Sequence, residues 1–199
     1  MIKRLVMLAI GFLTVGFALG LLRLSGLGLD PFATVNLGLA YLTGLSFGTW
    51  MMMTQGALAV IIFLKARQLI GLGTAMAVFG VGYAADIFFF LLVDIFSFSV
   101  DELWLQLTLL MIAVVILSSG VALLIVSNLW LGPYDAVGVV IEKMTQQKIS
   151  LRWARMITDT LLTGVAFLIG APIGIVILVT VFAMGPFINF FRTIYEKLL

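Results

Sequence analysis

The chain has 199 residues, of which 63% are hydrophobic and 10% charged, and its net charge is +2. With a mean hydropathy of +1.27, it is not a soluble domain, because a fold of this size cannot hide so much apolar surface from water. Cysteine and histidine are absent, which excludes disulfides, thiol catalysis and thiolate or histidine metal sites, and no basic run is dense enough for nucleic acid. We therefore expect an integral membrane protein in the lipid bilayer, with no cofactor and no nucleic-acid partner.

Six segments are apolar enough for transmembrane helices, each of which needs about 20 residues. They cover residues 5–23, 46–64, 69–93, 103–127, 150–170 and 172–191. The first resembles a secretory signal, but no cleavage site with a polar mature region follows it. The last two are separated by Gly170-Ala171-Pro172-Ile173-Gly174, whose helix-breaking residues favour a tight turn. The sequence thus predicts an all-α membrane protein with six transmembrane helices.

The basic residues predict the orientation of these helices. Ten of the eleven Lys and Arg residues fall on the side of the N-terminus: Lys3, Arg4, Lys65, Arg67, Lys143, Lys148, Arg152, Arg155, Arg192 and Lys197. Only Arg23 lies on the opposite side. Because basic loops stay in the cytoplasm, we expect a multi-pass cell-membrane protein with both termini cytoplasmic.

The second half of the chain repeats the first at an offset of 103 residues. Matching pairs are Trp50 and Trp153, Met53 and Met156, Leu58 and Leu161, Ile70-Gly71 and Ile173-Gly174, Phe79 and Phe182, and Gly82 and Gly185. Each half, residues 1–97 and 101–199, carries three predicted helices, so the second half enters the membrane from the opposite side. This pattern predicts two inverted three-helix repeats in one membrane domain, as in many transporters.

A Pro-containing segment follows the first helix and the fourth. Gly26-Leu27-Gly28-Leu29-Asp30-Pro31-Phe32 precedes Trp50, and Asn128-Leu129-Trp130-Leu131-Gly132-Pro133-Tyr134-Asp135 precedes Trp153. Helices that begin near Pro31 and Pro133 would direct partial positive charge toward an anionic group, with Asp30 and Asp135 placed to cap the free amides. Residues 27–44 and 131–149 are therefore either broken or re-entrant helices inside the membrane, or loops at its surface.

These motifs resemble a known family. The two Pro-containing segments, together with Gly71-Leu-Gly-Thr74, Gly80-x-Gly82, Ile173-Gly174 and Gly185-Pro186, are similar to those of the YczE/YyaS/YitT-like family of bacterial integral membrane proteins. The resemblance covers nearly the whole chain. It implies the architecture above and a place in the bacterial inner membrane. Members are often assumed to be transporters, although no activity is settled for the family.

Two aspartates lie within predicted helices, where a charge costs about 2.5 to 3.5 kcal/mol and needs a partner or a function. Asp86 either binds a cation or proton or forms a structural ion pair with Arg23. Its equivalent in the repeat is Asn189, which would contribute to an inner gate. Asp159 follows Arg155 by four residues, so the two share a helix face and are expected to pair; substrate contact by Asp159 is the alternative.

Uncharged polar residues complete the candidate site. Asn36 is expected to bond between helices, and Gln55 to face a central cavity beyond Trp50. The predicted substrate or ion site comprises Asp30, Pro31, Asn36, Gln55, Asp86, Pro133, Asp135, Asp159 and Asn189.

We favour a secondary transporter or permease for a small solute or ion, with its site at the interface of the repeats. The alternatives are the substrate-binding membrane subunit of an ATP-driven vitamin importer, which would require a coupling subunit, and a membrane partner or assembly factor without transport activity. An enzyme is disfavoured, because no Gly-x-Ser-x-Gly or phosphate-binding loop occurs. The sequence does not choose between a monomer and a homodimer, and it does not name the substrate.

Overall fold

The computed structural model describes residues 1–129 and 132–197, with the backbone alone at 151–152 and 181–183. Within these residues the elements are all helical. In chain order they are α1 (Ile2–Ser25), α2 (Pro31–Thr43), α3 (Phe47–Ala66), the 3-10 helix η1 (Arg67–Leu69), α4 (Leu72–Met76), the π-helix η2 (Ala77–Val81), α5 (Gly82–Phe90), the π-helix η3 (Leu91–Ile95), α6 (Leu103–Ser127), α7 (Pro133–Met144), α8 (Leu151–Leu168) and α9 (Val176–Glu196). The all-α prediction is confirmed.

A helix lies at each of the six apolar segments. By length and composition, four helices could cross a membrane: Ile2–Ser25, Phe47–Leu69, Leu72–Ile95 and Leu103–Ser127. The third of these joins α4, η2, α5 and η3 without a break in the helical backbone. Helices α8 and α9 occupy the fifth and sixth predicted segments. The apolar helices are those expected of a membrane protein.

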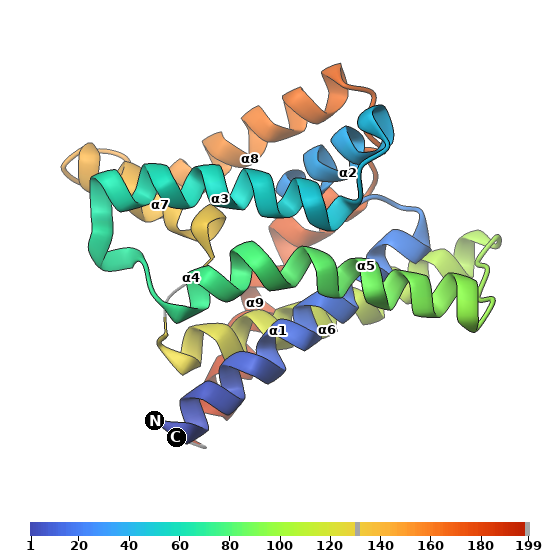
Figure 1. The fold of residues 1–199 in the computed structure, drawn as a ribbon, viewed down its shortest axis with the longest axis horizontal. Helices are drawn as coiled ribbons and strands as arrows, with labels where there is room; N and C mark the ends of the chain where they lie inside the picture. Colours follow the sequence, from blue (N-terminus) through green and yellow to red (C-terminus); the bar gives the residue numbers. More distant parts are fainter. Residues whose placement is uncertain (130–131, 198–199) are drawn as a thin grey trace.

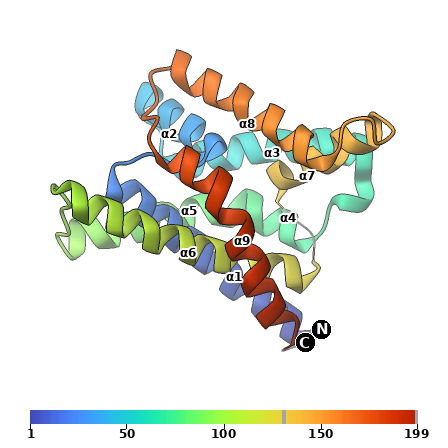
Figure 2. The ribbon, with the colours of Figure 1, turned by 180° about the vertical axis from the view of Figure 1, so that it is seen from behind.

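Helices α1 and α6 pack against each other in one layer of the molecule and run antiparallel (Figure 1). A Cβ atom added at Gly11 would lie 2.8 Å from Leu124, and one added at Gly120 would lie 2.9 Å from Val15. The absence of these Cβ atoms brings the two backbones close together, as small residues do between membrane helices. Helix α5 packs on α1, and α9 packs on α6 (Figure 2).

The remaining helices form a second layer, which contains α2, α3, α7 and α8 (Figure 1). Helices α3 and α8 run in opposite directions along it. The short helix α2 packs against α8 as well as its neighbour α3, and the short helix α7 packs against α3 as well as its neighbour α8. Each half of the chain therefore places its short helix against a long helix of the other half.

Both Pro-containing segments lead into short helices. Helices α2 and α7 have 13 and 12 residues, so at a rise of about 1.5 Å per residue they are roughly 20 and 18 Å long. The hydrocarbon core of a bilayer is about 30 Å thick. Neither short helix is long enough to cross it. Residues 31–43 and 133–144 are thus helical and not simple loops.

The break between the last two predicted segments is also present. Helix α8 ends at Leu168, and Gly170 follows with a left-handed φ of 67°. The chain after this break passes against the linker between α1 and α2, so closely that a Cβ atom added at Gly174 would lie 1.6 Å from the Leu27 carbonyl oxygen. The Val176 amide donates to that oxygen at 3.4 Å. The helix break predicted from Gly and Pro is confirmed, but residues 169–175 form a longer connection than the tight turn expected.

Candidate functional site

Helix α2 begins with an acidic cap. Asp30 is the N-cap residue, and its Oδ1 accepts hydrogen bonds from the amides of Phe32 and Ala33, both at 3.1 Å. Pro31 occupies the first helical position, where its missing N–H costs nothing. Burial raises the pKa of the Asp30 carboxyl, and the bond from the Ala33 amide opposes this shift. The predicted capping role of Asp30 is confirmed.

Helix α7 begins differently. Pro133 is again the first helical residue, but the N-cap is Gly132 and no side chain caps the amides. Asp135 instead accepts a hydrogen bond from Arg155 of α8, with 2.8 Å between Oδ1 and Nη1. The predicted capping by Asp135 is therefore wrong, because a guanidinium within reach offers a stronger, charge-assisted bond. Of the motif 131–135, Leu131 lies outside the described residues, as does Trp130.

The two helix starts meet through aromatic rings. Phe32 and Tyr134, each one residue after its proline, stack with centroids 4.6 Å apart and an interplanar angle of 11°. Offset stacking of this kind adds about 0.5 to 1.5 kcal/mol to the burial of the rings. The stack places the N-terminal ends of α2 and α7 next to each other.

Tyr134 also connects the stack to α8. Its hydroxyl donates a hydrogen bond to Asp159, and the Arg155 guanidinium lies 5.4 Å from its ring centroid. Burial, and then the bond to Asp159, raise the pKa of Tyr134, so its hydroxyl remains a donor at neutral pH. The predicted pairing of Arg155 with Asp159 is wrong, because the packing of α7 against α8 gives each a partner on α7. The side chain of Arg152 lies outside the described residues.

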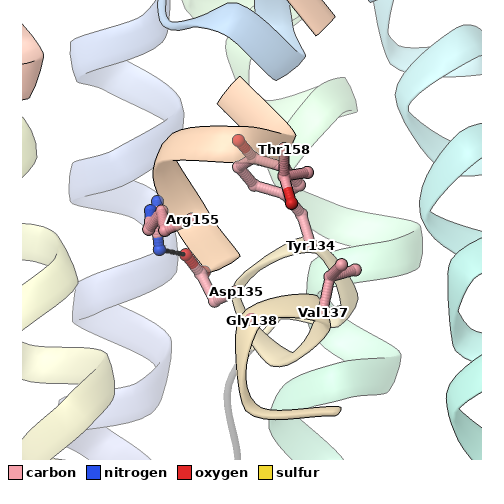
Figure 3. A pocket seen from close by; sticks show the side chains of 6 residues that line it. All are labelled: Tyr134, Asp135, Val137, Gly138, Arg155 and Thr158. Carbon is pink, nitrogen blue, oxygen red and sulfur yellow. Dashed lines mark hydrogen bonds and ion pairs between the residues drawn. The ribbon is translucent and has the colours of Figure 1, made fainter. Parts of the chain in front are cut away.

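A small pocket opens beside these groups, between α7 and α8 (Figure 3). Its volume is about 10 Å³, enough for about one water molecule. The lining residues are Tyr134, Asp135, Val137, Gly138, Arg155 and Thr158. Polar and charged groups therefore face a space too small for an organic solute.

Gln55 of α3 lies on the other side of the start of α7. Its side chain is buried, with 6% of its surface exposed, and Oε1 accepts no hydrogen bond from the described residues. A Cβ atom added at Gly132 would lie 3.5 Å from Asp135 Oδ2 and 3.9 Å from Gln55 Oε1. Both oxygens thus approach the same point at the N-terminal end of α7.

Asn36 connects α2 to α3. Its Nδ2 donates to the Phe32 carbonyl at 2.7 Å, and its Oδ1 accepts from Thr54 Oγ1 at 2.7 Å. Both polar ends of the buried amide are satisfied, and the expected bond between helices is confirmed. Asn36 holds the two helices together beside the cluster.

Asp86 is a separate site. Its Oδ1 binds Arg23 Nη1 at 2.6 Å, and its Oδ2 accepts the Gly48 amide at 2.6 Å. The guanidinium lies 5.0 Å from the Phe47 ring centroid and 4.2 Å from that of Phe89. Of the two hypotheses for Asp86, the structural ion pair with Arg23 is the one that the geometry matches.

The structure thus brings together part of the predicted set. Asp30, Pro31, Pro133, Asp135 and Asp159 gather around the aromatic stack, with Asn36 and Gln55 beside it, and we call this group the α2/α7 cluster. Asp86 lies apart, and the Asn189 side chain is exposed on α9. Sequence reasoning did not include Phe32 and Tyr134 in the site, although each directly follows one of the repeated prolines.

The chain matches the family of unknown function DUF6198 over residues 2–193, and it belongs to that family. It is 27% identical over 191 residues to the uncharacterized protein YyaS of Bacillus subtilis (strain 168), an alignment that covers 94% of this chain and 92% of that protein. No solved structure matches the chain significantly. The resemblance to YyaS-like proteins expected from the Gly and Pro motifs is confirmed.

Proposed function

We propose that this member of DUF6198 is a small transporter or permease made of two inverted three-helix repeats, with its solute site at the α2/α7 cluster. The observation that carries the proposal is the stack of Phe32 on Tyr134. At the offset of 102 residues that aligns Pro31 with Pro133, Phe32 and Tyr134 are equivalent. A contact between equivalent residues is what a two-fold relation between the halves would give. In transporters of this architecture the site lies at such an interface, at the ends of interrupted helices.

Paired hydrogen bonds support the repeat. Ser25 Oγ donates to Leu22 O at the end of α1, and Ser127 Oγ donates to Leu124 O at the end of α6, both at 2.7 Å. The Leu27 carbonyl accepts from the Val176 amide, and the Leu129 carbonyl accepts from the Gly73 amide. Positions 27 and 129 are equivalent at the offset of 102 residues that aligns Pro31 with Pro133, and positions 73 and 176 are equivalent at the offset of 103 that applies from Trp50 onward. The two linkers therefore dock on the opposite halves in the same way.

The direction of the helices supports an inverted relation. Equivalent helices α1 and α6 run antiparallel, as do α3 and α8 (Figure 1). The packing of α2 on α8 has its counterpart in the packing of α7 on α3. With α8 and α9 as the fifth and sixth spans, both termini lie on one side of the membrane, which agrees with the distribution of basic residues.

Transport in this architecture requires movement. The pocket between α7 and α8 is about 10 Å³ and does not admit an organic solute. We therefore treat this conformation as closed, with access created when one repeat moves relative to the other. Each side of the membrane would then reach the α2/α7 cluster in turn.

Single-cysteine labelling tests this proposal, because the chain contains no cysteine. Val137→Cys places a thiol in the pocket lining. Ser99→Cys and Lys148→Cys, in the exposed connections before α6 and before α8, serve as markers for the two membrane faces. An impermeant maleimide should label each marker from one side and Val137→Cys from both sides, in intact cells and in inverted vesicles. Labelling of Val137→Cys from one side alone contradicts alternating access.

A screen for thermal stabilisation of the purified protein would then identify the solute. A true ligand should raise the unfolding temperature of the wild type more than that of Tyr134→Phe, which keeps the ring but loses the bond to Asp159. Equal stabilisation of both proteins would place the solute elsewhere.

A further inference from the structure

Among the side chains that the structure describes, the α2/α7 cluster holds more carboxylates than basic groups. Asp30, Asp135 and Asp159 contribute three carboxylates, and Arg155 is the described basic side chain bound to them. The N-terminal ends of α2 and α7 each add about half a positive charge. Roughly two positive charges thus face three negative ones. About one further positive charge would balance these described groups.

The side chain of Gln55 indicates where a further positive charge would bind. Gln55 Oε1 is buried and accepts no hydrogen bond from the described residues, and a buried acceptor without a donor costs about 1 to 3 kcal/mol. It approaches the same point beside Gly132 as Asp135 Oδ2. Arg155 binds the other oxygen of Asp135, Oδ1. Both oxygens therefore lie within 4 Å of one point beside Gly132, and Gln55 Oε1 accepts no hydrogen bond from the described residues.

We propose that a small monovalent cation binds between Gln55 Oε1 and Asp135 Oδ2 at the start of α7. This inference rests on the proposed function, for which it supplies the class of coupling ion or substrate. Carbonyl and carboxylate oxygens are ligands for hard cations. A monovalent ion matches the excess of about one charge, and no grouping of three acidic side chains suited to a metal ion occurs among the described residues, so a divalent site is disfavoured.

The first experiment measures cation binding by the purified wild-type protein in detergent. Thermal unfolding is followed in NaCl, KCl and NH₄Cl, and in N-methylglucamine chloride as a bulky reference cation, at constant ionic strength. At least one small cation should raise the unfolding temperature with a saturable concentration dependence. The same set distinguishes an alkali ion from ammonium. Identical unfolding temperatures in all four salts overturn the proposal.

Two variants test the location. Gln55→Leu removes the oxygen ligand at similar volume. Gly132→Ala places a methyl group beside both oxygens, and its backbone angles, φ −59° and ψ 152°, suit alanine before proline. Each should weaken the apparent cation affinity by tenfold or more. Gly164→Ala, in α8 where no atom lies within 4 Å of the added Cβ, is the matched control and should bind as the wild type does.

Wild-type affinity in both site variants would overturn the location. Because binding is measured in detergent, it does not depend on transport. Cation binding without two-sided labelling of Val137→Cys would contradict the transporter but keep the cation site. Two-sided labelling without cation binding would support the transporter and contradict the cation site.

Discussion

The protein holds two Arg–Asp pairs between helices, and their surroundings differ. Arg23 and Asp86 join α1 to α5, with 13% and 22% of their side chains exposed, between two phenyl rings and against the Gly48 amide. Arg155 and Asp135 join α8 to α7, with 47% and 37% exposed, beside a pocket and two further carboxylates. The first pair is enclosed and balanced in charge. The second is open and, among the described side chains, lies beside more carboxylates than basic groups.

This difference distinguishes a pair with a structural role from a pair that lies in a candidate solute site. In the enclosed pair both oxygens of the Asp86 carboxylate are already bonded, so this carboxylate is less available to a ligand, and breaking the pair leaves a buried charge. An open pair contributes little to stability, and this one lies beside a pocket and further polar groups. Asp86 is the more conspicuous residue in the sequence, yet the α2/α7 cluster is the better candidate for a solute site.

The largest expected effect is that of Asp86→Ala. The variant leaves the Arg23 guanidinium buried without its partner, and we expect a loss of about 3 kcal/mol in the free energy of unfolding. Denaturant titration in detergent measures it, with the exposed Asp94→Ala as control. The double variant Arg23→Met, Asp86→Leu should lose less than Asp86→Ala. A loss in the double variant equal to the sum of both single losses would show that the two side chains are not coupled.

Gly48→Ala should cause the second-largest loss in the free energy of unfolding. A Cβ atom at this position would lie 2.8 Å from Asp86 Oδ2 and 2.9 Å from the Tyr83 backbone nitrogen, so α3 must move away from α5, at a cost of about 2 kcal/mol. Gly56→Ala, on the same helix with its nearest neighbour at 3.8 Å, should be neutral or stabilising. Equal stability of the two variants would mean that the approach of α3 to Asp86 is not tight.

Phe89→Leu should have a smaller effect. It removes the ring that lies 4.2 Å from the Arg23 guanidinium, and we expect a loss of about 1 kcal/mol from the cation–π contact. Phe90→Leu changes the exposed neighbouring ring and should cost less. If both variants unfold at the same denaturant concentration, the guanidinium does not gain from its aromatic enclosure.

The smallest effect is expected for Asp135→Ala. The open pair should contribute less than about 1 kcal/mol, and Arg155 keeps two other carboxylates in its surroundings. The same titration measures it against Asp86→Ala. A loss as large as that of Asp86→Ala would contradict the distinction between an enclosed and an open pair.

Much of the fold was predictable because its signals are local. The predicted segment 103–127 coincides with α6, since a long apolar run without Pro or charge has no other stable form in lipid. The Gly and Pro residues at 170–174 located the end of α8 for the same local reason. The ends of α9 were less accurate: it begins at Val176 and continues to Glu196, because polar residues extend a helix beyond its apolar part.

The candidate site was predictable only in part. Asp30 at the start of α2 follows from the motif Asp-Pro, because capping involves neighbours in sequence. The hydrogen-bond partners of Asp135 and Asp159 do not follow from a local motif, since both bonds join α7 to α8. The spacing of four residues along α8 predicted an ion pair of Arg155 with Asp159. In the structure, the packing of α8 against α7 pairs Arg155 with Asp135 instead.

The sequence by itself determined the membrane character, the position of the long helices and the two proline breaks, because hydropathy and backbone restrictions act over short stretches of chain. Only the tertiary structure decided which carboxylate is enclosed and which is open, and that Phe32 meets Tyr134 across 102 residues of chain. Such choices depend on how distant helices pack, and each pairing reflects the bonds and desolvation of several elements at once.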